Sequence, residues 1–358
     1  MWPRSALLRR LGIEHPIIQA PMAGGPSTPA LVAAVSGAGA LGSFAGGYLS
    51  PDAIRAAVRE IRRLTDRPFA LNLFVPEPAA RQVGPEEIAR ANEALRPFRE
   101  ELGLPPPPPS LPSPPRFADQ LAVALEEKVP VFSFTFGSLP AEEVRRLRTA
   151  GIVVVGTGTN LKEGRILEDA GVDAVVAQGS EAGGHRGTFA GPSEEGLIGT
   201  MALVPQLAGR LRVPVIAAGG IMDGRGIVAA LALGAQAAQM GTAFLAAAES
   251  GAHPRHKEAL LHPAEEDRTA LTRAFTGRLA RGVRNRFMVE MERRGAVLPY
   301  PAQGMLTQDI RQASARAERA DFLSLWAGQA APLATAKGAG EIVRDLVEQA
   351  RAVLGALR

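Results

Sequence analysis

The sequence predicts a closed (β/α)8 barrel, the TIM-barrel architecture, as the main fold of this 358-residue chain. Two observations lead to this prediction. Short runs of β-type residues recur along the chain, and a helical pattern follows most of them. These runs are almost continuously apolar, which is typical of a parallel sheet that is buried on both faces. Eight such units within roughly 240 residues match a closed barrel better than the alternative, an open doubly wound sheet.

The eight units can be placed on the chain one by one. The predicted strands span residues 16–20, 40–44, 69–74, 129–134, 152–156, 173–178, 213–218 and 235–240. Helical patterns fill most of the intervals, at 28–36, 54–64, 139–150, 161–170, 201–208 and 224–233, and the last barrel helix is expected at 340–354. Ser50, Pro51 and Asp52 supply an N-cap, a first-turn proline and a first-turn acid for the helix that follows.

Two stretches interrupt this rhythm. Residues 76–115 form a proline-rich insertion, with a helix predicted at 85–95 and five consecutive prolines at 105–109. We expect a stiff polyproline loop over the barrel rim there, and a PxxP ligand is the alternative. Residues 246–320 are rich in Arg, Glu and Ala and predict a small helical domain on the substrate side. The barrel then comprises residues 1–245 and 321–358.

One glycine motif has the wrong surroundings for nucleotide binding. Residues 37–42 read G-x-G-x-x-G, the spacing of a dinucleotide-binding turn. That turn must follow a strand and open a helix, whereas this copy follows a predicted helix and enters a strand. We therefore interpret it as a helix end and a tight turn.

Composition excludes several classes of protein. The chain has no cysteine, which excludes disulfides, cysteine-ligated metals and a thiolate nucleophile. Lys and Arg total 40 against 36 acidic residues, and the arginines are scattered among few aromatic residues, so we expect no nucleic-acid partner. No apolar run approaches a membrane span, and the first ten residues lack the apolar stretch of a signal peptide. A cytoplasmic protein that binds no membrane is the expectation.

The ends of the last two strands predict a phosphate site. Gly219 and Gly220 follow the seventh strand, and Gly241 and Thr242 follow the eighth. Glycines at these corners expose backbone N–H groups to an anion, and Thr242 adds a hydroxyl donor. The alternative is that these glycines only allow tight turns.

His185 is the strongest catalytic candidate, because it alone among the five histidines lies in a glycine-rich loop after a strand. An imidazole can act as a base or as a hydrogen-bond donor near neutral pH. Glu181 is a competing base, or a brace for the loop. Tyr300, between two prolines, is a tentative substrate contact.

Other polar groups have simpler interpretations. His253, His256 and His262 invite a metal hypothesis, but no carboxylate pattern accompanies them, and we expect no metal site. The arginines of a downstream cluster are interpreted as a solvated face or a domain contact, with anionic-substrate binding as the alternative; they are Arg281, Arg284, Arg286, Arg293 and Arg294.

These motifs resemble the FMN-dependent nitronate monooxygenase family, formerly the 2-nitropropane dioxygenases, and its class I in particular. The resemblance spans nearly the whole chain, and residues 181–187 (EAGGHRG) are its most specific part. It implies an FMN cofactor and His185 as the catalytic residue. The residues that it implies around the cofactor are Ala20, Pro21, Met22, Asn72, Gln178, Gly183, Gly219, Gly220, Gln239, Met240, Gly241 and Thr242.

The resemblance also implies an activity. Alkyl nitronates, and neutral nitroalkanes as a further substrate, would be oxidised with O2 to carbonyl compounds and nitrite. His185 would deprotonate the nitroalkane or hold the nitronate oxygens. FMN-dependent enoyl-acyl-carrier-protein reductases and NAD(P)H:quinone reductases look similar and are the alternatives, and a flavin-binding module without turnover is a third. A homodimer is the candidate assembly.

Overall fold

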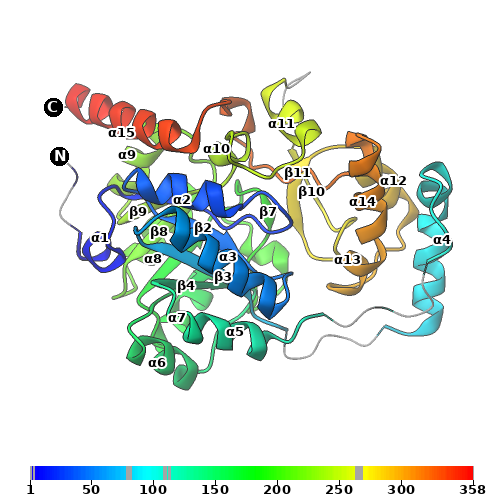
Figure 1. Ribbon diagram of the computed structural model, residues 1–358, viewed down its shortest axis with the longest axis horizontal. Helices are drawn as coiled ribbons and strands as arrows, with labels where there is room; N and C mark the ends of the chain where they lie inside the picture. Colours follow the sequence, from blue (N-terminus) through cyan, green and yellow to red (C-terminus); the bar gives the residue numbers. More distant parts are fainter. Residues whose placement is uncertain are drawn as a thin grey trace.

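The computed structural model describes residues 2, 5–77, 83–107, 111, 114–262 and 269–357. The predicted barrel is confirmed. Its eight strands are all parallel, in the order β1-β9-β8-β6-β5-β4-β3-β2. A parallel bridge between Ile18 and Leu41 joins the two edges of this sheet and closes it (Figure 1).

The strands lie within one or two residues of their predicted positions. They are β1 (Ile17–Gln19), β2 (Gly42–Ala45), β3 (Phe69–Phe74), β4 (Val131–Thr135), β5 (Val153–Gly158), β6 (Ala174–Gln178), β8 (Val215–Ala218) and β9 (Ala237–Met240). Helices cover the outside of this sheet, namely α2 (Pro29–Gly37), α3 (Pro51–Leu64), α5 (Phe117–Glu126), α6 (Ala141–Thr149), α7 (Leu161–Asp169), α8 (Thr200–Ala208), α9 (Gly224–Ala232), the short α10 (Thr242–Leu245) and α15 (Ala339–Ala356). An N-terminal helix, α1 (Ala6–Leu11), precedes them.

Sequence chemistry explains where these elements begin. The Ser50 side chain accepts a hydrogen bond from Ala53 N at the start of α3, as its N-cap position predicts. Gly42, the last glycine of the G-x-G-x-x-G spacing, lies where α2 passes directly over β2. A Cβ there would come within 2.2 Å of the Val32 carbonyl oxygen. Helix α2 ends at Gly37 and Gly39 has a φ of +83°, so residues 37–42 form the expected helix end and tight turn, and Gly42 in addition lets α2 pack on β2.

The segment 246–320 contains more than the predicted helices. It holds α11 (Pro254–Leu261), α12 (Arg286–Arg294), α13 (Ala302–Leu306) and α14 (Gln308–Arg316), and also two strands, β10 (Thr269–Thr272) and β11 (Ala280–Val283). These strands form a three-stranded antiparallel sheet with β7 (Gly184–His185), which belongs to the loop after β6. The sequence indicated the helices but not these two strands, because strands of four residues with mixed polarity show no clear period.

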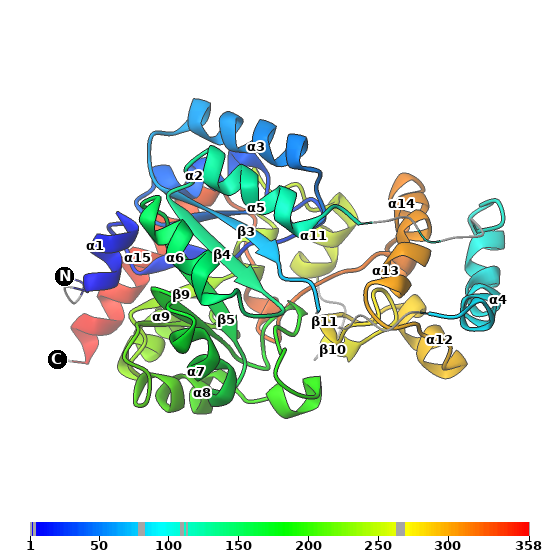
Figure 2. The ribbon, with the colours of Figure 1, turned by 90° about the horizontal axis from the view of Figure 1, so that it is seen from below.

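The helix predicted in the proline-rich insertion is present and is longer than predicted. This helix, α4, runs over Pro85–Glu101 and packs against the segment 246–320 (Figures 1 and 2). Phe98 is fully buried there against Phe287 and Phe322, with ring centroids 4.8 and 5.3 Å away. Residues 108–110 of the predicted polyproline stretch lie outside the described residues.

Two further features concern the position of the terminal helices and the length of the helices. The first and last helices, α1 and α15, lie on the side of the barrel away from α4 (Figure 1). Among the residues that the structure describes, no helix has the length and apolar character that crossing a bilayer requires. The division of the chain at residues 245 and 320 into two domains stays a prediction.

Candidate active site

A cavity of about 960 Å³ lies at the carboxyl ends of the barrel strands, beneath the segment 246–330. It gathers loops from far apart in the sequence, as expected for a barrel whose loops after the strands form the site. All fourteen residues proposed for the site from the sequence line it: Ala20, Pro21, Met22, Asn72, Gln178, Gly183, His185, Gly219, Gly220, Gln239, Met240, Gly241, Thr242 and Tyr300.

The glycine corners after β8 and β9 form one wall of the cavity. Gly219 and Gly220 have φ angles of +114° and +71°, which side chains rarely adopt, so glycine is required at this turn. The N–H groups of Gly219, Gly220 and Gly241 donate no hydrogen bond to any described residue. Thr242 Oγ1 accepts a hydrogen bond from Gly328 N at 3.0 Å, and its own proton stays available. These donors match the needs of a bound anion such as a phosphate.

The loop after β6 packs closely against the segment after β9, which also lines the cavity. A Cβ on Gly183 would lie 2.5 Å from the Ala327 carbonyl carbon, so the two backbones touch here. Glu181 does not line the cavity. Its carboxylate accepts hydrogen bonds from Thr200 N at 2.9 Å and from Thr200 Oγ1 at 2.8 Å. Glu181 is therefore a brace for the loop, the second of its two interpretations.

Gln178 and Arg186 fix the course of this loop. The Gln178 amide donates to the His185 carbonyl at 3.0 Å and accepts from Gly187 N at 2.8 Å. The fully buried Arg186 guanidinium donates to the carbonyls of Gln178 and Gly179 at 2.7 and 2.6 Å. Both side chains thus hold the backbone that carries His185. A direct contact of Gln178 with a flavin stays a prediction.

His185 lies on β7 and faces side chains from the segment 246–330. Its Nε2 lies 2.8 Å from Thr276 Oγ1. The rings of Phe136, Tyr300 and Trp326 surround the imidazole at centroid distances of 5.8, 6.3 and 5.3 Å. Burial, with smaller contributions from the nearby Arg278 and Arg311 guanidinium groups, lowers the pKa of His185 to about 3. The imidazole is therefore neutral at pH 7.

Arg278 is a site residue that the sequence analysis missed. Its guanidinium Nε donates to the Arg186 carbonyl at 3.1 Å, and its other nitrogens donate to the Thr188 carbonyl and the Glu77 carboxylate. It also lies over the Phe136 ring, 4.1 Å from the centroid. Arg278 therefore joins loops after three barrel strands around the cavity. No local motif marks it, because its partners lie about 90 and 200 residues away in sequence.

Phe136, Thr276 and Arg311 were missed as well. Phe136 has a φ of +77°, a strained conformation for a bulky residue, and such strain often occurs at functional sites. Arg311 lines the cavity, and its guanidinium donates to the Thr307 and Gly304 carbonyls. The residue types that follow β4 gave no indication of the strained backbone at Phe136.

The predicted arginine cluster separates into two groups. Arg286 contacts Glu101 of α4 at 2.9 Å and Glu290 at 2.5 Å, so it forms the expected domain contact. Arg281 is buried, and its Nε donates to the Ser180 carbonyl at 3.1 Å. Neither side chain lines the cavity.

The histidines of α11 make hydrogen bonds to the backbone. His253 Nε2 lies 3.0 Å from the Ala315 carbonyl oxygen, and His256 Nε2 lies 3.0 Å from the Trp326 carbonyl oxygen. Burial lowers the pKa of His256 to about 4. Within the described parts of the chain, no group of three or more His, Asp or Glu side chains is placed to hold a metal ion.

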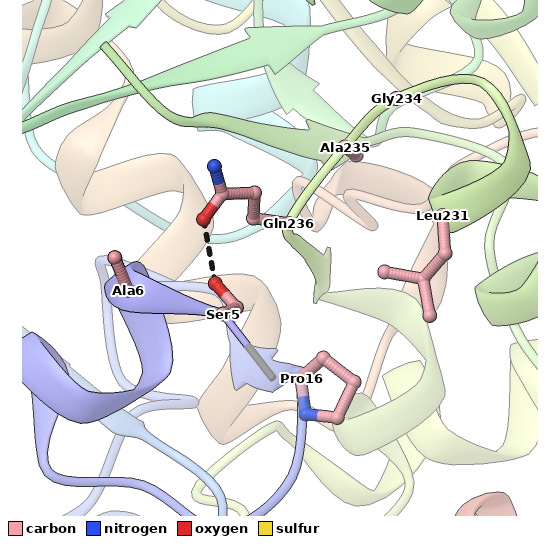
Figure 3. A pocket seen from close by; sticks show the side chains of 7 residues that line it. All are labelled: Ser5, Ala6, Pro16, Leu231, Gly234, Ala235 and Gln236. Atoms are coloured by element: carbon pink, nitrogen blue, oxygen red, sulfur yellow. Dashed lines mark hydrogen bonds between the residues drawn. The ribbon is translucent and has the colours of Figure 1, made fainter. Parts of the chain in front are cut away.

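A smaller pocket of about 280 Å³ lies at the opposite, amino-terminal end of the barrel (Figure 3). Ser5 Oγ lies 2.5 Å from Gln236 Oε1 across it, and Pro16 and Leu231 form its apolar wall. Its lining contains no titratable side chain, so it offers no acid or base, and no base is present to activate the Ser5 hydroxyl. The large cavity is therefore the candidate active site.

Comparisons with known proteins identify the family of this chain. The sequence model of the nitronate monooxygenase family matches residues 4–349. A probable nitronate monooxygenase of Staphylococcus haemolyticus is 42% identical, and the match covers all of both chains. The structure of a nitroalkane oxidase from Streptomyces ansochromogenes is 43% identical with a TM-score of 0.92, covering 99% of this chain and 100% of that one.

A second similarity is more distant. The structure of FabK from Thermotoga maritima is 32% identical with a TM-score of 0.76, and it covers 99% of both chains. The family match spans nearly the whole chain, and it includes the glycine corners and the His185 loop. The chain therefore belongs to the nitronate monooxygenase family of flavin-dependent oxidoreductases.

Proposed function

We propose that this protein binds FMN and oxidises alkyl nitronates with O2, giving carbonyl compounds and nitrite. The observation that carries the proposal is the neutral, partly buried imidazole of His185, with Arg278 and Arg311 nearby, in the cavity that the glycine corners also line. A nitronate is an anion, and two guanidinium groups create a favourable potential for it.

The donor set of the cavity fits an FMN. The free N–H groups of Gly219, Gly220 and Gly241, together with the Thr242 hydroxyl, suit its phosphate. Asn72 and Gln239 line the same cavity and offer amide groups to the ring edge, while Met22 offers an apolar contact. When bound, the FMN would supply the electron-transfer chemistry that these side chains lack.

The protein's own groups bind and orient the substrate. Arg311 lines the cavity directly, and Arg278 acts from behind the Phe136 ring. The aromatic side chains of Phe136, Tyr300 and Trp326 pack around the His185 ring and restrict its orientation. With a neutral nitroalkane, His185 would act as the base. With a preformed nitronate no proton has to be removed, so the low pKa of His185 favours nitronates as the better substrates.

Nitrite release tests this function. The purified protein should be yellow, release FMN on denaturation, and form nitrite from propyl nitronate in air without a nicotinamide. A colourless protein that takes up no FMN contradicts the cofactor proposal. Rapid NADH consumption with a crotonyl thioester or a quinone, and no nitrite, would instead establish an enoyl reductase or a quinone reductase. The similarity to FabK makes the enoyl reductase the second candidate.

Two smaller proposals complete this description. A cytoplasmic location and a homodimer both stay predictions. Cell fractionation tests the first, and light scattering of the purified holoenzyme tests the second.

A further inference from the structure

The two ring nitrogens of His185 have different surroundings. Nε2 lies 2.8 Å from Thr276 Oγ1, whereas Nδ1 makes no hydrogen bond with any residue that the structure describes. Since His185 lines the cavity, Nδ1 is the ring nitrogen that is left for a ligand. A neutral imidazole carries one proton, so one nitrogen donates and the other accepts. Which nitrogen carries the proton decides whether His185 presents a base or a donor to the substrate.

The surroundings of the Thr276 hydroxyl decide between these two tautomers. Thr276 is 4% exposed, so water does not complete its hydrogen bonds. Besides His185, its Oγ1 has two neighbours, both at 3.4 Å: the Arg278 carbonyl, which can only accept, and the Arg278 N–H, which can only donate. No other described group donates to that carbonyl.

A hydroxyl supplies one donor and two acceptor sites. If Thr276 donates to the Arg278 carbonyl, it can accept from both the Arg278 N–H and the imidazole Nε2–H, and every group has a partner. If Thr276 donates to Nε2 instead, the carbonyl of the buried Arg278 keeps no partner, which is costly. The complete set of hydrogen bonds therefore requires a proton on Nε2.

We propose that Thr276 is a positioning residue that holds neutral His185 as the Nε2–H tautomer, so that the Nδ1 lone pair is the proton acceptor in the active site. The proposal rests on the function proposed above. The three aromatic rings around the imidazole support it, because they oppose a ring rotation that would exchange the two nitrogens. The low pKa of His185 keeps the ring neutral, so one tautomer can persist at pH 7.

The proton-transfer step follows directly. The C–H bond beside the nitro group breaks, and its proton forms a new bond to Nδ1. The electron pair of that bond moves onto the nitro group and gives a nitronate, while His185 becomes an imidazolium that still donates from Nε2 to Thr276. No additional reactant is needed. A preformed nitronate omits this step, so only the neutral nitroalkane depends on the tautomer.

Nitrogen NMR of the holoenzyme measures the tautomer without any turnover. The chain has five histidines, so two-bond ¹H–¹⁵N spectra of ¹⁵N-histidine-labelled protein are simple, and a His185→Asn variant assigns the signals of His185. We expect a protonated Nε2 and an unprotonated Nδ1 at pH 7. A wild-type protein with the proton on Nδ1 overturns the proposal.

Variants at Thr276 test the role of the hydroxyl. Thr276→Val keeps the shape but cannot accept, so we expect a mixture of tautomers and a loss of about tenfold in kcat/KM for the neutral nitroalkane. The loss for the preformed nitronate, which needs no proton transfer, should be clearly smaller than the loss for the neutral nitroalkane. Thr276→Ser keeps the hydroxyl, so it should keep the wild-type tautomer and rate. The control for a Thr-to-Val change away from the site is Thr65→Val, at the end of α3 on the far side of the barrel.

The outcomes separate the proposal from the proposed function. A Thr276→Val protein with the wild-type tautomer and an unchanged ratio of nitroalkane to nitronate activity contradicts the role of Thr276. If Thr276→Val does not fold, the wild-type spectrum and the Thr276→Ser variant still test the proposal. A Thr276→Ser protein that carries the proton on Nδ1 of His185 contradicts the role of Thr276. Failure of the proposed function shows separately, as an absence of nitrite from the wild-type holoenzyme.

Discussion

Replacing Arg278 by methionine should destabilise the protein strongly, because this side chain joins loops around the active site. Methionine has a similar length and no charge, so the variant removes the hydrogen bonds with little loss of apolar packing. The Arg278 side chain is only 5% exposed, and the carbonyls of Arg186 and Thr188 receive two of its N–H groups. Glu77, its third partner, is 43% exposed and can turn to water.

The magnitude follows from these contacts. Each buried carbonyl that loses its partner costs about 1–3 kcal/mol, and the stacking of the guanidinium on Phe136 contributes about 1 kcal/mol. Against this, burial lowers the pKa of Arg278, so removing the charge relieves a desolvation cost. We therefore expect a net loss of about 3 kcal/mol in the free energy of unfolding.

Urea unfolding of the holoenzyme measures this loss. With an m value of about 3 kcal/mol per M, the midpoint should fall by about 1 M. Arg278→Lys keeps the charge but lacks the planar set of donors, so it should recover only part of the stability. Methionine should also raise the pKa of His185, because one of two nearby cations is gone. A midpoint within 0.3 M of wild type, roughly 1 kcal/mol, would refute the reasoning.

Three further predictions follow from the site. His185→Asn should reduce turnover of a neutral nitroalkane more than turnover of its nitronate in steady-state assays, and equal losses would exclude a base role. Gly183→Ala places a Cβ 2.5 Å from the Ala327 carbonyl carbon, so it should cost about 1–3 kcal/mol and weaken FMN binding by titration, unlike Gly355→Ala, whose Cβ meets open space. Burial lowers the pKa of His256 to about 4, so between pH 6.5 and pH 4 the unfolded protein binds a proton at this residue and the folded protein does not. The free energy of unfolding should therefore fall by up to about 3 kcal/mol as the pH is lowered from 6.5 to 4. Thermal melting at several pH values measures this fall, and His256→Gln should reduce it.

The barrel and the glycine corners that line the cavity could be predicted from the sequence, for a physical reason. Each strand of a parallel barrel is buried on both faces, so it appears as an apolar run, and its carboxyl end points to the site whatever its neighbours are. Gly219, Gly220 and Gly241 could therefore be assigned to a corner from local sequence alone. All of them line the cavity.

The rest of the site depends on contacts between distant segments. Thr276 and Arg278 come near His185 because β11 pairs with β7, with Ala280 opposite His185. Nothing in a run of four residues predicts which distant loop it will pair with. The packing of α4 on Phe287 and Phe322 has the same origin, since the apolar face of α4 does not specify its partner.

The pairing of β7 with β11 has a consequence for how reactivity can change. The glycine corners after β8 and β9 belong wholly to the barrel, whereas the orientation of the imidazole depends on the segment after β9. Replacing the segment after β9 would leave the barrel and its glycine corners in place. It would change the orientation of the His185 side chain. The short antiparallel pairing of β7 with β11 is therefore a place where reactivity can change while the barrel stays the same.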